Sequence, residues 1–334
     1  MASRARSPIC RRVSEDTAPL EAALAAVPAA AGRASALRLK EGVASLVLEV
    51  GGMPVDARQR LESDVREALG AVQGVAEVRV AMTAEKVERT IVAVGSGKGG
   101  VGKSTVAANL AIALARAGKK VGLVDADIYG PSQPRIMGSE GRRPELAGKQ
   151  IVPLRAFGIR MLSIGHLVEP GQALAWRGPM AASALGQLIE GDWGDAELLV
   201  VDLPPGTGDI QLSLIQKWKP AAAIIVSTPQ DLALIDATRA IDLFRKMDVA
   251  VAGLIENMSG YACPHCGEVS DPFGAGGAEA AARVMGIPFL GRIPLTLSLR
   301  MASDAGVPPA AGAGAEADLF AALAARLLAE LASA

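Results

Sequence analysis

The sequence has few cysteines, few aromatic residues and no excess of charge of either sign. It contains three cysteines in 334 residues, 3% aromatic residues, and 34 basic against 35 acidic side chains. Three cysteines cannot form a disulfide framework, so a reducing cytoplasm is the expected compartment. The balanced charge argues against a nucleic-acid partner. The scarcity of aromatics leaves a core of Ala, Val, Leu and Ile, which suits helices packed on a parallel sheet.

Long hydrophobic runs are also absent. The mean hydropathy is +0.31, but apolar runs such as AAAIIVSTP are much shorter than the roughly 20 residues of a membrane-spanning helix. The C-terminal segment places four leucines on one helical face, namely Leu319, Leu323, Leu327 and Leu331. The polar side of this helix is mainly acidic, whereas anionic lipids attract bases. We therefore expect no membrane partner, and we expect this helix to pack onto its own domain.

The patterning predicts four regions. Residues 1–18 are rich in arginine and are expected to form a disordered basic tail. Residues 19–83 have the pattern of a small α+β domain, and residues 84–88 form a charged linker. From residue 89 to 334, apolar strands alternate with helices. This alternation predicts a mostly parallel, doubly wound α/β sheet that is covered on both faces.

The small domain has four readable elements. The sequence predicts helices over 20–27 and 54–70, and strands over 43–50 and 75–82. In the large domain, residues 138–179 are rich in Gly, Pro and Arg and predict no clear element.

The segment GKGGVGKST, residues 97–105, satisfies the phosphate-loop pattern G-x-x-x-x-G-K-[ST]. It follows a predicted strand and opens a predicted helix, as the mechanism requires. Glycines let the backbone N–H groups face phosphate oxygens, helped by the positive end of the helix. Lys103 would neutralise the β and γ phosphates, and Ser104 would ligate Mg²⁺. The expected nucleotide cradle consists of Gly97, Lys98, Gly99, Gly100, Val101, Gly102, Lys103, Ser104 and Thr105. A chance glycine-rich turn is the alternative, which the complete motif disfavours.

Lys98, directly after the first glycine, makes this segment resemble the deviant Walker A sequence of the MinD/ParA/ArsA group of ATPases. The resemblance extends from about Arg89 to the end of the chain. It implies a homodimer in which Lys98 reaches the nucleotide of the other subunit, as an arginine finger does elsewhere. The alternative is a solvated lysine that assists phosphate binding only by general attraction.

The same resemblance assigns roles to polar residues at strand ends. In VGLVDADIYGPS, Asp125 would lie near the metal, and Asp127 would orient or deprotonate the attacking water. LLVVDLPPGTGD resembles the Walker B segment and second switch, with Asp202 holding the water shell of Mg²⁺. A carboxylate that ends a buried strand needs a cation or hydrogen bonds. The alternative, that Asp202 is only a turn residue at the end of its strand, is therefore disfavoured. ENMSG places Asn257 where related ATPases contact adenine, although a turn-forming asparagine is the alternative. The sequence contains no NKxD motif, which argues against a guanine pocket. ATP is therefore the expected nucleotide.

YACPHCGEVS contains Cys263 and Cys266 at a spacing that lets both thiols point at one metal. A tetrahedral thiolate site needs four ligands. The third cysteine, Cys10, lies in the predicted tail, and His265 is expected to point away. A CxxC alone is a weak signal, because half a zinc ribbon, a thiol-redox pair and a coincidence together account for it about as well as a cluster site does.

Three segments together resemble the Mrp (ApbC) branch of iron–sulfur cluster carriers, namely NMSGYACPHCGEVSDPFG, WRGPM and VDLPPGTGDIQLSL. The resemblance implies that Cys263 and Cys266 of two subunits hold one bridging [4Fe-4S] cluster on the symmetry axis. It also implies an ATPase that receives the cluster from a scaffold and delivers it to apoprotein acceptors. The small domain resembles the iron–sulfur-assembly type, but Met53 stands where a cysteine is usual. A thioether cannot replace a thiolate as a nucleophile or cluster ligand. We therefore expect this domain to serve in docking or folding, and not to bind metal.

Two other functions remain open. A MinD/ParA-type positioning ATPase would need a basic membrane helix or a basic DNA-binding patch, and the acidic C-terminal helix argues against it. A P-loop ATPase with structural zinc at its interface would use the same cysteines, because zinc and iron both accept four sulfurs.

Overall fold

The structure is a computed structural model. It describes residues 17–51, 53, 55–83, 88–148, 150–168 and 178–333. Most of the predicted tail and linker lies outside these residues, as do Cys10, Pro54 and Trp176. The chain divides into two compact units, Met1–Val87 and Glu88–Ala334.

The small unit is a three-stranded sheet with helices packed on it. Its elements are α1 (Ala18–Ala25), the 3-10 turn Pro28–Ala30, β1 (Ala34–Lys40), β2 (Val43–Glu49), α2 (Val55–Gly70) and β3 (Glu77–Thr83). The central strand β2 pairs antiparallel with β1 and parallel with β3. Alternate side chains of β2, such as Leu46 and Leu48, form a buried cluster with Leu61, Val65 and Leu69 of α2. The unit therefore has a core of its own.

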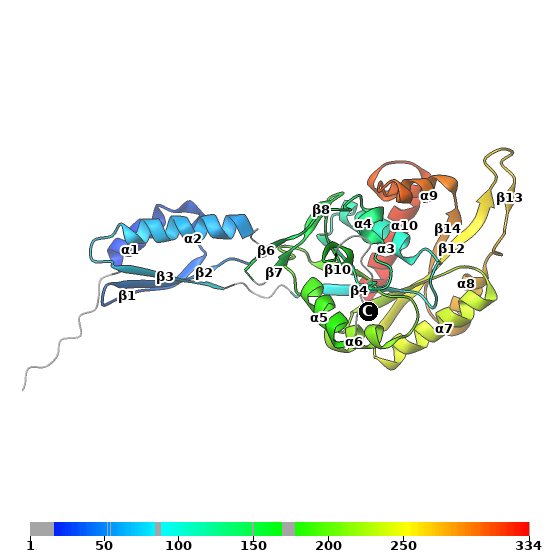
Figure 1. The fold of residues 1–334 in the computed structure, drawn as a ribbon, viewed down its shortest axis with the longest axis horizontal. Coiled ribbons are helices and arrows are strands. Elements are labelled where there is room, and N and C mark those ends of the chain that lie inside the picture. The colour runs from blue at the N-terminus through cyan, green and yellow to red at the C-terminus, as the bar shows by residue number, and fades with distance from the viewer. Residues whose placement is uncertain are drawn as a thin grey trace, which may run out of the picture. The chain divides into compact units, whose positions relative to one another are not determined.

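The large unit is built on a nine-stranded sheet (Figure 1). Its strands are β4 (Thr90–Gly95), β5 (Val121–Asp125), β8 (Leu154–Ala156), β9 (Ile159–Ser163), β10 (Leu198–Asp202), β11 (Ala222–Ser227), β12 (Ala250–Ala262), β13 (Val269–Ser270) and β14 (Phe289–Leu295). The order is β13-β12-β11-β4-β10-β5-β9-β8, and β14 also pairs with β12. Within the described part of this sheet, only the pairs β12–β13 and β8–β9 are antiparallel. The predicted α/β class with a mostly parallel sheet is confirmed.

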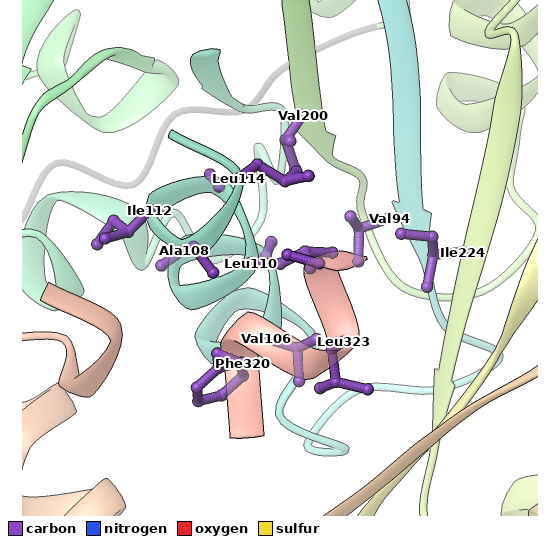
Figure 2. Close-up of a cluster of buried hydrophobic side chains, with 14 of the residues drawn as sticks. Val94, Val106, Ala108, Leu110, Ile112, Leu114, Val200, Ile224, Phe320 and Leu323 are labelled. Atoms are coloured by element: carbon purple, nitrogen blue, oxygen red, sulfur yellow. The ribbon is translucent and has the colours of Figure 1, made fainter. Parts of the chain in front are cut away.

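Helices cover both faces of this sheet (Figure 1). They are α3 (Lys103–Arg116), α4 (Gln133–Ile136), α5 (Gly178–Ile189), α6 (Asp209–Trp218), α7 (Asp231–Lys246), α8 (Gly277–Met285), α9 (Leu297–Asp304) and α10 (Ala315–Ser333). Helices α3 and α10 share one buried cluster, in which Leu110 and Leu323 face strand residues such as Val94 (Figure 2). Helices α5 to α8 contribute to a second cluster with the opposite strand faces. The predicted packing of the C-terminal helix is confirmed, since Leu323 and Leu327 are buried.

The segment over 138–179 that gave no sequence pattern adds short edge elements. It contains the hairpin β6 (Glu145–Ala147) and β7 (Gln150–Val152), then β8, β9 and the 3-10 turn Ile164–His166. The remaining 3-10 turn is Pro309–Ala311. Among the described residues, no helix combines the length and apolar character needed to cross a bilayer.

Parallel pairing brings several strand ends to one edge of the sheet. Asp202, at the end of β10, lies in register with Asp125 of β5 and Val94 of β4. Because loops beyond the carboxyl ends of such strands form the binding site of this architecture, the polar residues predicted at strand ends gather there.

Candidate functional site: a phosphate-loop cleft and a two-thiol hairpin

The phosphate loop connects β4 to α3 and bends at glycines. Gly100 and Gly102 both have φ of +81°, a conformation that favours glycine. Gly97 is required for a different reason, because a Cβ at this position would overlap the backbone of Asp236 in α7. The loop lines a cleft of about 400 Å³, to which every residue from Lys98 to Thr105 contributes. The predicted cradle from Lys98 to Thr105 therefore forms one continuous surface, and Gly97 packs against α7 outside the lining of the cleft.

Lys103 brings the predicted catalytic groups together. Its side chain is 6% exposed, and its Nζ lies 2.5 Å from Oδ1 of Asp202 and 3.8 Å from Oδ2 of Asp127. The same ammonium donates to Oγ of Ser104 at 3.4 Å. Lys98 also lines the cleft and is half-buried, and within the described residues no ion pair involves it. Lys98 is thus available for an anion or for a second chain.

The two aspartates after β5 have different environments. Asp127 lines the cleft, and burial raises its pKa against the opposing influence of Lys103. Its Oδ1 accepts hydrogen bonds from the backbone N–H groups of Tyr129 and Gly130 at 3.2 and 3.3 Å. Asp125 is fully buried, and burial together with the Asp202 charge raises its pKa to about 7. Of the two, only Asp127 can meet a ligand in the cleft directly.

Asp125 organises the loop behind the cleft. Its carboxylate accepts hydrogen bonds from the hydroxyl of Ser163 at 2.8 Å, from the backbone of Gln133 at 3.1 Å and from the backbone of Asp127 at 3.2 Å. These bonds tie the start of α4 and the end of β9 to the end of β5. Asp125 therefore fixes the position of Asp127.

The segment after Asp202 is anchored at its beginning and free further on. The backbone of Leu203 donates to Val94 at 3.0 Å, and that of Gly206 donates to Ser96 at 2.9 Å. Thr207 and Gly208 are exposed. This pattern suits a switch segment that responds to a γ phosphate.

Asn257 supports the phosphate loop. Its side chain is 6% exposed, and Nδ2 donates to the carbonyl of Val101 at 2.8 Å. A Cβ on Gly102 would overlap this amide, so the two segments are tightly packed. Contact between Asn257 and adenine stays a prediction.

The cleft includes residues that the sequence motifs did not reveal. Ser132 and Arg135 line it near α4, and Ser303 and Asp304 line it at the end of α9. Ser132 ends the segment VGLVDADIYGPS, but no local motif marks Arg135, Ser303 or Asp304. A weak signal was available for the last two, because α9 follows the carboxyl end of a parallel strand, β14.

Cys263 and Cys266 lie in the hairpin between β12 and β13, which extends beyond the parallel part of the sheet (Figure 1). Cys263 is half-exposed and Cys266 is exposed. The turn is closed by two hydrogen bonds of 2.9 Å, from the Cys263 backbone to Glu268 and from the Gly267 backbone to Cys263. Hydrogen bonds from the backbone N–H groups of His265 and Cys266 lower the pKa of the Cys263 thiol. The turn therefore favours the thiolate that metals bind.

The thiol pair is incomplete as a metal site within one chain. Among the described residues, no group of three or more His, Cys, Asp or Glu side chains is placed to hold a metal ion. His265 is exposed beside the pair. Any tetrahedral site here therefore needs ligands from outside the described residues.

A buried carboxylate fixes β12 just before Asn257. Glu256 has 0% exposure, and it accepts hydrogen bonds from Ser259 Oγ at 2.7 Å and from the backbone of Ala278, at the start of α8, at 2.8 Å. The backbone of Gly276 donates at 3.1 Å, and Arg292 adds an ion pair at 3.2 Å. Strand β12 is thus held to α8 by Glu256 and to the phosphate loop by Asn257.

Comparison with known proteins agrees with this geometry. Residues 87–328 match the family described as ParA, NUBPL iron-transfer P-loop NTPase. The chain is 51% identical over 223 residues to the Arabidopsis thaliana iron-sulfur protein required for NADH dehydrogenase, mitochondrial, covering 66% of this chain and 71% of that protein. It is 49% identical over 225 residues to the iron-sulfur cluster carrier protein of Pseudomonas fragi, covering 66% and 78%.

A solved structure shares both fold and sequence. The nucleotide-binding protein of Archaeoglobus fulgidus in complex with ADP is 40% identical, with a TM-score of 0.57, over 65% of this chain and 86% of that one. The resemblance inferred from the motifs is confirmed. The chain belongs to the NUBPL iron-transfer family of ParA-type P-loop NTPases.

Proposed function

We propose that the protein is a homodimeric ATPase that carries a [4Fe-4S] cluster and delivers it to apoproteins. The observation that carries this proposal is the solvent-accessible pair Cys263 and Cys266, which has no further metal-ligand group beside it among the described residues. A twofold axis beside the hairpin would supply the second pair, since it places identical patches face to face. Four thiolates are the ligand set of a [4Fe-4S] cluster. The iron–sulfur names of the relatives support iron–sulfur cargo.

The cleft supports ATP as the nucleotide, with Mg²⁺. The donors beside Lys103 are all oxygens, namely Ser104, Asp127 and Asp202, and hard oxygen donors suit Mg²⁺. Ser104 would hold the cation directly and Asp202 would hold it through water. Bound there, Mg²⁺ would offset charge on the transferred phosphoryl group.

The chain's own residues divide the work of hydrolysis. Lys103 exchanges Asp202 for the β and γ phosphates when the nucleotide enters. Asp127 accepts a proton from the attacking water while the water oxygen bonds to the γ phosphorus. The bond between the γ phosphorus and the bridging oxygen breaks at the same time, and ADP leaves with that oxygen. A pKa raised by burial makes Asp127 the stronger base. Lys98 of each copy reaches the nucleotide of the other, so ATP holds the dimer together and hydrolysis loosens it.

Strand β12 offers a physical link between nucleotide and thiols. Asn257 holds the phosphate loop, and Cys263 follows it on the same β12–β13 hairpin. Between them Met258 has a φ of +59°, and the pairing with β14 shifts register. A change in the phosphate loop can therefore be transmitted along this strand to the cluster ligands.

Anaerobic reconstitution tests the cargo. Wild type, Cys263→Ala and the control Cys10→Ala are loaded with iron and sulfide, then measured for iron, sulfide, zinc, absorption and mass. We expect about four irons per two chains in wild type and in Cys10→Ala, and loss of both cluster and cluster-dependent dimer in Cys263→Ala. A colourless wild-type protein holding zinc would support an interfacial zinc site instead. A loaded monomer would contradict the proposal.

Transfer kinetics test the coupling. The rate of cluster delivery to an apoprotein acceptor is measured with ATP, with ADP and without nucleotide, for wild type and Asn257→Ala. We expect nucleotide dependence in wild type that Asn257→Ala reduces. Equal rates in all conditions would contradict the coupling but not the cluster.

A further inference from the structure

Gln133, the first residue of α4, connects three parts of the nucleotide site. Its side chain is fully buried. Its backbone N–H donates to Oδ2 of Asp125 at 3.1 Å, while its Nε2 donates to Oδ2 of Asp202 and to the carbonyl of Ser104, both at 2.9 Å. One residue thus bridges the ends of β5 and β10 and the first turn of α3.

The orientation of the Gln133 amide is determined by its partners. The Asp202 carboxylate and the Ser104 carbonyl both accept hydrogen bonds, so the NH₂ group must face them. The amide oxygen Oε1 is left buried, with no hydrogen-bond partner among the described residues. A buried acceptor without a donor costs about 1–3 kcal/mol.

Among the described residues the Asp202 carboxylate has two side-chain partners, and in the proposed mechanism the nucleotide takes one of them away. Its Oδ1 lies 2.5 Å from Nζ of Lys103, and its Oδ2 accepts from Gln133. When Lys103 turns to the phosphates, the bond to Gln133 is the contact that still orients this carboxylate. Mg²⁺ keeps several waters in protein sites, and these waters are hydrogen-bond donors. Oε1 of Gln133 and the Asp202 carboxylate would then both accept hydrogen bonds from magnesium-bound waters.

We propose that Gln133 is a positioning residue of the magnesium–nucleotide site, which orients Asp202 through Nε2 and accepts a hydrogen bond from a magnesium-bound water through Oε1. This inference rests on the proposed nucleotide function and not on the cluster. Since partners of this kind contribute about 10- to 100-fold to metal affinity, the effect is measurable without turnover.

The test compares nucleotide affinity with and without Mg²⁺. A fluorescent ATP analogue is titrated into wild type, Gln133→Met and Gln211→Met, in excess chelator and at graded Mg²⁺ concentrations. Gln211→Met is the matched control, because Gln211 is also buried with an unpartnered Oε1, and its Nε2 donates to Pro204. Gln133→Asn, which keeps the amide but is one methylene shorter, replaces Gln133→Met if the latter does not fold.

We expect the Gln133 variant to need about 10-fold more Mg²⁺ than wild type for the half-maximal effect of Mg²⁺ on its affinity for the ATP analogue. Its affinity for the analogue without Mg²⁺ should stay within about 2-fold of wild type. Gln211→Met should leave the magnesium requirement at the wild-type value. An unchanged requirement in the Gln133 variant, or an equal loss of affinity with and without Mg²⁺, would overturn the role of Gln133 alone. Wild-type binding that ignores Mg²⁺ would overturn the magnesium site itself, and this role with it.

Discussion

The ammonium of Lys103 lies 2.5 Å from the carboxylate of Asp202, and both side chains are buried. Removing one partner of a buried pair leaves a desolvated charge. We expect Lys103→Met to abolish binding of a fluorescent ATP analogue and to lower the free energy of unfolding by roughly 3 kcal/mol. Urea denaturation measures the second effect.

The double variant Lys103→Met with Asp202→Asn separates these two effects. It removes both charges, so most of the lost stability should return while nucleotide binding stays absent. A single variant as stable as wild type would show that the ion pair does not stabilise the nucleotide-free fold.

Two glycines of the phosphate loop should respond differently to a methyl group. A Cβ on Gly97 would overlap the backbone of Asp236, whereas a Cβ on Gly99 has Pro205 as its nearest neighbour at 3.9 Å. We expect Gly97→Ala to lower the free energy of unfolding by about 1–3 kcal/mol, because α7 or the loop must shift. Gly99→Ala should stay within about 0.5 kcal/mol of wild type. Equal thermal stability of the two variants would contradict the close approach of α7.

The pKa of Cys263 predicts a difference in thiol reactivity. Backbone N–H groups of His265 and Cys266 lower the pKa of Cys263 below its usual value, so its thiolate persists at lower pH. In a Cys10→Ser background, iodoacetamide alkylation of the Cys266→Ser variant should reach half its maximal rate below the pH that is usual for cysteine. Mass spectrometry follows the reaction, with a cysteine-containing unstructured peptide as the reference. Identical pH profiles for the protein and the peptide would contradict the turn geometry.

His166 predicts how stability depends on pH. Its Nδ1 accepts from the backbone of Ser163 at 3.2 Å, and its Nε2 lies 3.0 Å from the hydroxyl of Ser139. Burial and the charge of Arg142 lower the pKa of His166 to about 4. Between this value and the ordinary histidine pKa of about 6.5, the unfolded chain binds a proton that the folded chain does not, so stability falls as the pH falls.

We expect His166 to cost about 2 kcal/mol of stability between pH 7.5 and pH 5. The measurement is urea denaturation at both pH values for wild type and His166→Gln, whose side chain does not titrate. The loss should be smaller in the variant by that amount. Parallel losses in both proteins would show that His166 titrates normally in the fold.

The sequence predicts the parts of this protein that local patterns encode. The segment over 97–105 combines a strand, a glycine-rich turn and a helix in one continuous stretch, so its structure and location follow from the motif. The strand predicted over 43–50 corresponds to β2, which alternates regularly. Strand β1 was missed, because Ala36 has a φ of +54° and the register shifts between Ser35 and Arg38. Such a bulge interrupts the alternation that identifies a strand.

Residues that meet only in the folded chain could not be predicted. Gln133 and Ser303 have no motif of their own, and they reach the nucleotide site through α4 and α9. Asn257 was predicted to follow a strand, but it lies within β12, which continues to Ala262. Its bond to Val101 depends on how closely β12 approaches the phosphate loop. Pairing partners of this kind are properties of the assembled sheet.

The contacts of Glu256 and Asn257 both depend on which face of β12 each side chain occupies. Glu256 reaches α8 and Asn257 reaches the phosphate loop, because consecutive side chains of a strand face opposite sides. Inserting one residue before Glu256 would exchange the two faces, so that the carboxylate would face the phosphate loop and the amide would leave it. Ser259 bonds to Glu256, and Tyr261 pairs with both β13 and β14. We therefore expect changes of hairpin length to be tolerated only in the thiol turn between β12 and β13, and nowhere earlier in the strand.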